Sequence, residues 1–224
     1  MSETALLRLR RVSRYYGERP VLRRLDLEIE AGRSLLVVGA NGEVKSTLLR
    51  LLAGLLPPNE GEVESTLPPG AIGYLGHRTL SYPQLTARAN VTFWQAMYGL
   101  PPDPDAVNAV LARVGLARFA DEEAGNFSRG MAQRLSLARV FLTAPRLLLL
   151  DEPAAGLDPA SAQWLGREIR DAATSGAAVV WVSHHVAADI PLADTVVFLK
   201  GGRAVYTGPA SDFDPETLCR EATC

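Results

Sequence analysis

The stretch Ser34–Ser46, SLLVVGANGEVKS, decides the fold of this 224-residue chain. Its first five residues are typical of a buried strand, and a helical pattern, STLLRLLAGLL, begins at Ser46. The residues from Gly39 to Ser46 nearly match G-x-x-x-x-G-K-[ST], a loop whose backbone N–H groups and following helix hold phosphates. A strand, a glycine-bearing loop and a helix in this order predict a phosphate-binding loop in an α/β fold.

Lysine usage supports this interpretation, because Lys45 of the loop and Lys200 are the only two lysines in a chain rich in arginine. A compact ammonium at this place suits the β- and γ-phosphates of a nucleotide. Val44 departs from the motif, because it replaces the glycine before the lysine. Valine at positive φ is strained by about 1–3 kcal/mol, and Glu43 adds negative charge. We therefore expect this loop to bind ATP less well than the unaltered motif does.

A second run, Leu147–Leu150, is followed by two carboxylates. Asp151 is placed to hold Mg²⁺ through water, and Glu152 to orient or deprotonate an attacking water. Taken alone, the run is a weak signal, and the alternative is a buried strand that ends in a solvated turn. Together with the loop at Lys45, it predicts the second half of a nucleotide site.

Hydrophobic periodicity predicts an antiparallel layer of two N-terminal strands, followed by a mostly parallel α/β core with a helical insertion. The expected strands are residues 5–12, 21–30, 34–38, 71–75, 147–150, 177–182, 195–199 and 204–206. The expected helices are residues 46–56, 87–98, 104–116, 128–142 and 160–173.

Composition excludes several classes of protein. The net charge of −2 argues against a general nucleic-acid binder. The longest apolar runs are of strand length, which argues against a membrane span, and the N-terminus lacks the pattern of a secretory signal. Cys219 and Cys224 do not make a disulfide framework, so a reducing, cytosolic compartment is expected.

The segment Asn126–Arg134, NFSRGMAQR, resembles the LSGGQ signature of ABC transporter ATP-binding subunits, and the resemblance covers almost the full chain. It implies the fold class: an α/β, three-layer P-loop NTPase core with an N-terminal antiparallel β layer and an inserted α-helical subdomain. The implied boundaries are 1–76 and 145–224 for the ATP-binding core and 77–144 for the helical, signature-bearing subdomain.

The resemblance also implies roles for the motif residues and the cofactors ATP and Mg²⁺. His184 is the switch histidine and acts with Glu152, and Ser46, Asp151 and His77 are the metal ligands, with His77 in the place of the family's glutamine. Ser128 and Gly130 face the nucleotide of a second subunit, and Asp158 belongs to the D-loop. The implied nucleotide-binding residues are Tyr16 (with Tyr15 as the alternative for stacking on adenine), Gly39, Ala40, Asn41, Gly42, Glu43, Val44, Lys45, Ser46 and Thr47.

The segment YLGH, residues 74–77, with LTARANVTFW further along, resembles the ATPases of the cytochrome c maturation, or heme export, system. This resemblance implies a homodimer of ATPase subunits at the cytoplasmic face of the inner membrane, coupled to an integral membrane transporter subunit. A small exporter ATPase for drugs or lipids is the alternative, since such proteins share the Ser-Arg-Gly-Met form of the signature. A subunit with impaired ATP binding and a soluble ABC protein of DNA repair or translation are further alternatives.

Overall fold

Two β-sheets form the framework of the computed structural model, which describes residues 5–39 and 43–214. Within these residues a six-stranded sheet has the order β5-β6-β7-β3-β8-β9, and a three-stranded sheet has the order β2-β1-β4. The strands are β1 Ala5–Tyr16, β2 Arg19–Glu30, β3 Ser34–Gly39, β4 Glu60–Ser65, β5 Ile72–Leu75, β6 Leu147–Asp151, β7 Ala178–Val182, β8 Thr195–Lys200 and β9 Arg203–Pro209. The α-helices are α1 Glu43–Leu52, α2 Ala87–Met97, α3 Pro104–Arg113, α4 Arg129–Phe141, α5 Pro159–Thr174 and α6 Val186–Asp189.

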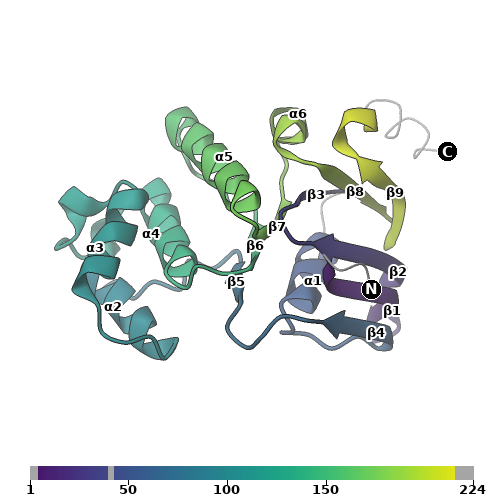
Figure 1. Ribbon diagram of the computed structural model, residues 1–224, viewed down its shortest axis with the longest axis horizontal. Coiled ribbons are helices and arrows are strands. Elements are labelled where there is room, and N and C mark those ends of the chain that lie inside the picture. Colours follow the sequence, from purple (N-terminus) through teal and green to yellow (C-terminus); the bar gives the residue numbers. More distant parts are fainter. Residues whose placement is uncertain (1–4, 40–42, 215–224) are drawn as a thin grey trace.

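The larger sheet is parallel from β5 to β8, and β9 adds an antiparallel edge. The smaller sheet is antiparallel throughout. Figure 1 shows the smaller sheet at one end of the molecule and α2, α3 and α4 gathered at the other, with the larger sheet between them. The predicted fold class, an α/β core with an N-terminal antiparallel β layer and a helical insertion, is thereby confirmed.

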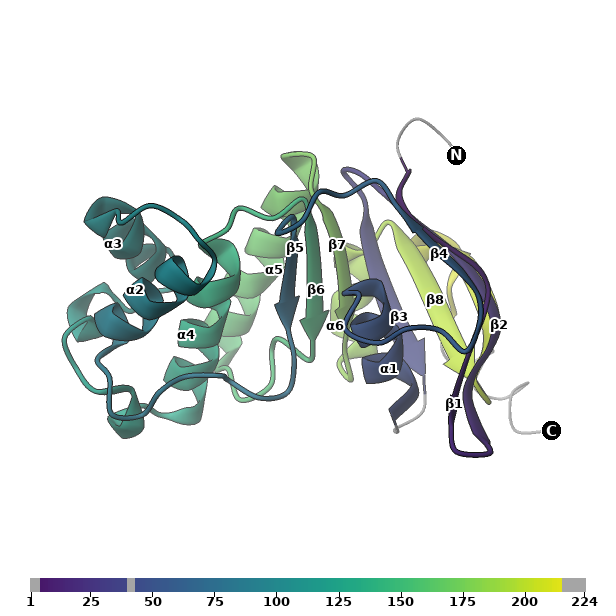
Figure 2. The ribbon, with the colours of Figure 1, turned by 90° about the horizontal axis from the view of Figure 1, so that it is seen from below.

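The larger sheet separates two apolar cores. Leu35 and Val37 of β3 pack with α1 and the smaller sheet, whereas Leu36 and Val38 of the same strand pack with α2 to α5. Figure 2 shows α1 beside the sheet and the antiparallel layer beyond it. Because successive side chains of a strand point to opposite faces, a strand buried on both faces is an unbroken apolar run. This is why SLLVV and LLLL carried a clear sequence signal.

Polar residues set where the helices begin. Ser128 caps α4 through its side-chain oxygen, which accepts the N–H of Met131, and Asp158 caps α5 by accepting the N–H of Ser161. The helices of the insertion pack on one another and on the face of the sheet that carries Leu75 and Leu150. In the part of the chain that the structure describes, no helix is both long and apolar enough to cross a membrane.

Several predicted boundaries were wrong by a few residues, and two elements were not predicted. The short helix α6 has no periodic apolar pattern, and β4 has the sequence EGEVES. Strand β4 pairs with β1 so that its glutamates lie opposite arginines, Glu64 opposite Arg8 and Glu62 opposite Arg10. Arg10 Nε also lies 2.9 Å from Glu64 Oε1, across the diagonal. The helix predicted to begin at Ser46 begins at Glu43 instead, so the loop residues Val44 and Lys45 are helical.

We expect Asp194→Ala to lower the free energy of unfolding by about 1–3 kcal/mol. The carboxylate of Asp194, before β8, accepts the backbone N–H and the hydroxyl of Ser34 at 2.8 Å each, so it ties the start of β3 to β8. Ser34 is 3% exposed, so its N–H would lose its acceptor at a place with little access to water. Urea denaturation measures the loss, and Asp171→Ala, at an exposed carboxylate of α5, is the control. Equal stability of the two variants would contradict this role of Asp194.

Candidate functional site

Lys45 lies at the start of α1, directly beyond the carboxyl end of β3. Its side chain is buried, and Nζ donates to the carbonyl of Gly39 at 2.8 Å. Burial lowers the pKa of Lys45, against the opposing influence of the carboxylates of Glu152 and Asp151. Gly39 is needed as glycine because an added Cβ would lie 2.5 Å from the carbonyl oxygen of Leu199 on β8. The two ends of the predicted loop are therefore held against the sheet.

The strain that we expected at Val44 is not found. Val44 lies in α1, it is not among the described residues with positive φ, and its side chain packs against the core beneath the antiparallel layer. The helix begins early enough to give Val44 an ordinary backbone conformation, which corrects that prediction. Ala40, Asn41 and Gly42 lie outside the described residues, as does the side chain of Glu43, so their predicted roles stay predictions.

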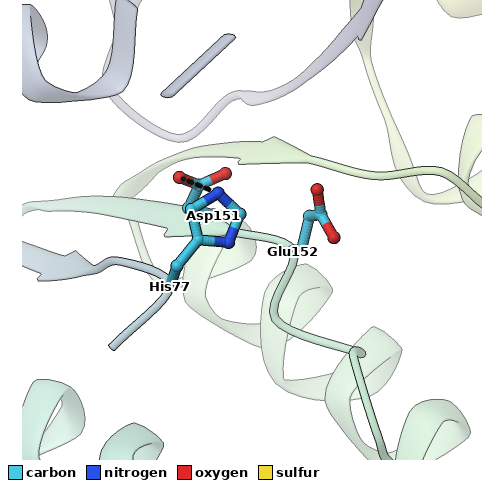
Figure 3. Close-up of side chains that lie close together, drawn as sticks. All are labelled: His77, Asp151 and Glu152. Carbon is cyan, nitrogen blue, oxygen red and sulfur yellow. Dashed lines mark ion pairs between the residues drawn. The ribbon is translucent and has the colours of Figure 1, made fainter. Parts of the chain in front are cut away.

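Three candidate metal ligands from different parts of the chain meet beside Lys45. His77 follows β5, Asp151 ends β6, and Ser46 lies in α1. The His77 Nε2 atom lies 3.1 Å from Ser46 Oγ and 3.2 Å from Asp151 Oδ2, and Figure 3 shows the imidazole beside that carboxylate. The Asp151 side chain is 1% exposed, and neither of its oxygens has a hydrogen-bond partner, since the 3.2 Å contact has ion-pair distance but not hydrogen-bond geometry. A buried carboxylate without hydrogen bonds fits a divalent cation, so these residues suit one.

Glu152 and His184 form a second pair next to this cluster. His184 Nε2 lies 2.7 Å from Glu152 Oε1. Glu152 directly follows β6, and His184 lies two residues after the end of the neighbouring strand β7. The backbone of Glu152 has a φ of +52°, which a non-glycine residue adopts only under constraint. Its N–H donates to the carbonyl of Val182, and this bond holds the carboxylate at the edge of the sheet. The pair is suited to activating and orienting a water molecule.

The predicted signature and D-loop residues lie together at the starts of α4 and α5. A Cβ on Gly130 would lie 3.0 Å from the carbonyl oxygen of Gly156, so the first turn of α4 rests closely on the D-loop. The Asp158 carboxylate caps α5, and its hydrogen bond from the Ser161 N–H lowers the pKa of Asp158. The Ser128 hydroxyl is likewise a helix cap. Helix capping explains why Ser128 and Asp158 are polar, and close packing explains why residue 130 is glycine. The roles of these residues toward a second subunit stay predictions.

The predicted adenine-stacking residue, Tyr16, is partly buried at the end of β1. Its hydroxyl lies 3.3 Å from that of Thr47 in α1, and the guanidinium of Arg14 lies 5.5 Å from its ring centre. Tyr15, the alternative, donates instead to Glu60 on β4 at 3.3 Å. Tyr16 is therefore the tyrosine that is joined to the loop helix.

Three further residues shape the site and were not singled out from the sequence. Gln133 of α4 donates to the carbonyl of Pro153 at 3.0 Å, and the Ser183 hydroxyl accepts the N–H of His185. Arg139, buried in α4, donates to the Tyr74 carbonyl on β5, three residues before His77. In the sequence, the only indication of a role for these three residues was that each lies on the same helix or loop as a motif residue.

A cavity of about 680 Å³ opens beside the Glu152–His184 pair, between α5 and α6. Its wall is largely apolar and includes Leu165, Ile169 and Trp181. Arg167 and Arg170 also line it, but the phosphate-binding motif lies at Lys45, on the other side of the pair from this cavity's apolar wall. We therefore take the Lys45 side of the pair as the candidate nucleotide site.

Comparison with known proteins identifies the family. Residues 22–155 match the family described as ABC transporter. The chain belongs to this family. ABC ATPases bind ATP, typically with Mg²⁺, and their cassettes work as dimers with membrane subunits.

The relatives and solved structures agree with this membership. The chain is 37% identical over 196 residues to the cytochrome c biogenesis ATP-binding export protein CcmA of Cereibacter sphaeroides, over 86% of this chain and 89% of the relative. It is 28% identical to the linearmycin resistance ATP-binding protein LnrL of Bacillus subtilis, over 92% of this chain and 70% of that protein. A solved ATP-binding subunit of an ABC transporter superposes with a TM-score of 0.87 at 24% identity, over 98% of this chain and all of the other, which supports the fold alone.

Proposed function

We propose that this ABC ATPase subunit hydrolyses ATP to drive an exporter of the cytochrome c biogenesis system, with heme as the exported group. The observation that carries the ATPase part is the Glu152–His184 contact of 2.7 Å beside Lys45 and Asp151. The likeness to cytochrome c biogenesis export proteins supports the choice of system.

In this proposal the loop from Gly39 to Thr47 holds the phosphates, with the Lys45 ammonium on the β- and γ-phosphates and Tyr16 against the adenine. Ser46, Asp151 and His77 hold Mg²⁺, which when bound neutralises phosphate charge. Glu152 accepts a proton from the attacking water, and His184 fixes the carboxylate. The Lys45 ammonium stabilises charge on the transferring phosphoryl group.

The proposal requires two copies of the chain. Ser128 and Gly130 lie at the start of α4, where the positive end of the helix dipole is. The loop that leads to Asp158 lies against the same turn, through Gly156. In a head-to-tail homodimer this surface faces the nucleotide held by the other copy. An integral membrane subunit docks on the helical subdomain, residues 77–144, while 1–76 and 145–224 form the ATP-binding core, at the cytoplasmic face of the inner membrane.

A MgATP titration of the full chain, followed by phosphate release, tests the ATPase part. We expect saturable turnover with a KM between about 1 µM and about 1 mM. Deletion of the gene in its own host tests the transport system, and we expect loss of c-type cytochromes on heme-stained gels. Normal cytochromes with a new sensitivity to drugs or detergents would favour the alternative of a small drug or lipid exporter, for which the likeness to LnrL is the supporting observation.

We predict that Val44→Gly raises MgATP affinity several-fold and lowers the free energy of unfolding by about 1 kcal/mol. Val44 packs in the first turn of α1, so glycine costs helix stability and apolar contact, but it restores the glycine that the phosphate-binding motif has before Lys45. Equilibrium binding and urea denaturation measure the two effects. Unchanged affinity would dismiss the alternative that Val44 impairs ATP binding.

A further inference from the structure

The cavity between α5 and α6 has the size and the lining of a small-molecule site. Its volume of about 680 Å³ lies within the range of about 300–1,000 Å³ that is typical of ligand pockets. Leu165 and Ile169, one turn apart on α5, supply an apolar wall, and Trp181 of β7 also lines the cavity. A wall of this kind suits the apolar body of a bound molecule.

The same wall contains a polar group without a partner. Trp181 is 1% exposed, and its indole Nε1 has no hydrogen-bond partner among the described residues, although the N–H of a buried tryptophan usually finds one. Neighbouring atoms cover Nε1, so an acceptor on a bound molecule reaches it after a small shift of the wall. This unsatisfied donor is an observation independent of the volume of the cavity.

Two arginines supply positive charge on the α5 side of the cavity. Arg167 and Arg170 are exposed, line the cavity and lie three residues apart, which makes them neighbours on the helix surface. Neither guanidinium forms an ion pair with another described residue. Two carboxylates also line the cavity: Glu152 contacts His184, and Asp189 lies on α6. An acid group in the cavity is therefore attracted to the α5 side.

We propose that this cavity is an effector site for an amphipathic organic anion, a molecule with an aromatic or aliphatic body and one carboxylate or sulfonate. The body packs against Leu165, Ile169 and Trp181, and the acid group lies at Arg167 and Arg170. A wholly polar molecule does not suit the site, because the apolar wall offers few partners for the hydrogen bonds that the molecule gives up with water.

The position of the cavity connects its occupancy to hydrolysis. Glu152 and His184 line it, so an occupant restricts the movement of both side chains. This effector part rests on the proposed function, in which Glu152 accepts the proton of the attacking water. We expect occupancy to lower ATP turnover.

The test is a fluorescence titration of the full chain with anilinonaphthalene sulfonate, a probe that joins an apolar ring system to one acid group. Ala162→Phe fills the cavity from α5, and Ala160→Phe is its matched control, because Ala160 is exposed on the same helix and outside the lining. The double variant Arg167→Gln/Arg170→Gln removes the positive charge of the site. Its matched control, Arg19→Gln/Arg203→Gln, removes the same charge at exposed positions outside the cavity.

We expect saturable binding of one probe per chain. Ala162→Phe should weaken it by about 10-fold or more, and Arg167→Gln/Arg170→Gln by about 3–30-fold, while both controls bind as the unaltered chain does. Probe bound on another surface would not respond to these changes, so equal binding by each variant and its control would overturn the inference. Circular dichroism checks folding, and the arginine variants, at exposed positions, carry the test if Ala162→Phe does not fold.

Phosphate release from MgATP, measured on the same samples, tests the effector part. Saturating probe should lower turnover of the unaltered chain, and should do so less in Ala162→Phe than in Ala160→Phe. Site-specific binding that left turnover unchanged would overturn the effector role. A chain that bound the probe at this site but showed no turnover without it would contradict only the proposed ATPase function, and turnover without probe binding would contradict only this inference.

Discussion

Replacing Glu152 with glutamine is expected to reduce ATP turnover by about 10²–10⁴-fold while leaving nucleotide binding close to that of the unaltered chain. Glutamine keeps the size and the hydrogen-bonding reach of the side chain toward His184, which lies 2.7 Å away, but it cannot accept a proton from water. Phosphate release under saturating MgATP measures the change, and equilibrium binding of the nucleotide measures what is retained.

Glu18→Gln is the matched control, because Glu18 is an exposed carboxylate in the turn between β1 and β2. It removes the same charge from the chain outside the Glu152–His184 pair and should turn over normally. If Glu152→Gln hydrolysed ATP at an undiminished rate, the carboxylate would have no part in proton transfer, and another group would have to activate the water.

Lys45→Met is expected to abolish ATP binding and, at neutral pH, to raise the free energy of unfolding by about 1 kcal/mol. The ammonium is buried, and desolvation lowers the pKa of Lys45, which means that folding disfavours its charged form. Methionine keeps the length of the side chain without the charge. Binding of MgATP and urea denaturation measure the two effects, and a variant that bound ATP normally would contradict the role of Lys45.

The pH dependence of stability provides a second test of Lys45. Its pKa in the folded chain is below the ordinary value of 10.5, so the unfolded chain binds the extra proton between these two values. Stability should therefore rise with pH through this window in the unaltered chain. The difference in unfolding free energy between Lys45→Met and the unaltered chain should shrink over the same window. If the difference in unfolding free energy did not change with pH, the buried charge of Lys45 would not be the cause of the difference.

The parts of the fold that sequence predicted well are those that are buried on both faces. SLLVV and LLLL became β3 and β6, whose alternate residues enter the two cores. Strand β4 escaped prediction because EGEVES has no apolar alternation, and it is stabilised by pairing with β1 and by ion pairs such as Arg10–Glu64. Such pairing depends on residues more than fifty positions away, which periodicity within a short window does not contain.

Motif spacing was enough to bring together Lys45, Ser46, Asp151, Glu152 and His184 as candidates, because all lie at or beyond the carboxyl ends of the parallel strands β3, β6 and β7. Sequence was wrong about backbone strain at Val44, since the loop motif alone does not show where α1 begins. It also did not single out Gln133 and Arg139, which act through carbonyl groups of neighbouring segments. Contacts between a side chain and a distant backbone have no residue-type signature.

The core that joins α2 to α5 with one face of the larger sheet limits how this protein can be recombined with its relatives. A chimera that exchanged only the segment between β5 and β6 would pair foreign helices with Leu36, Val38, Leu148 and Leu150, side chains shaped for other neighbours. Crossovers that carry α5 and the residues of β3, β6 and β7 that face this core along with the insertion would keep that packing intact. The unit of exchange is thus defined by a face of the sheet, and it is discontinuous along the chain.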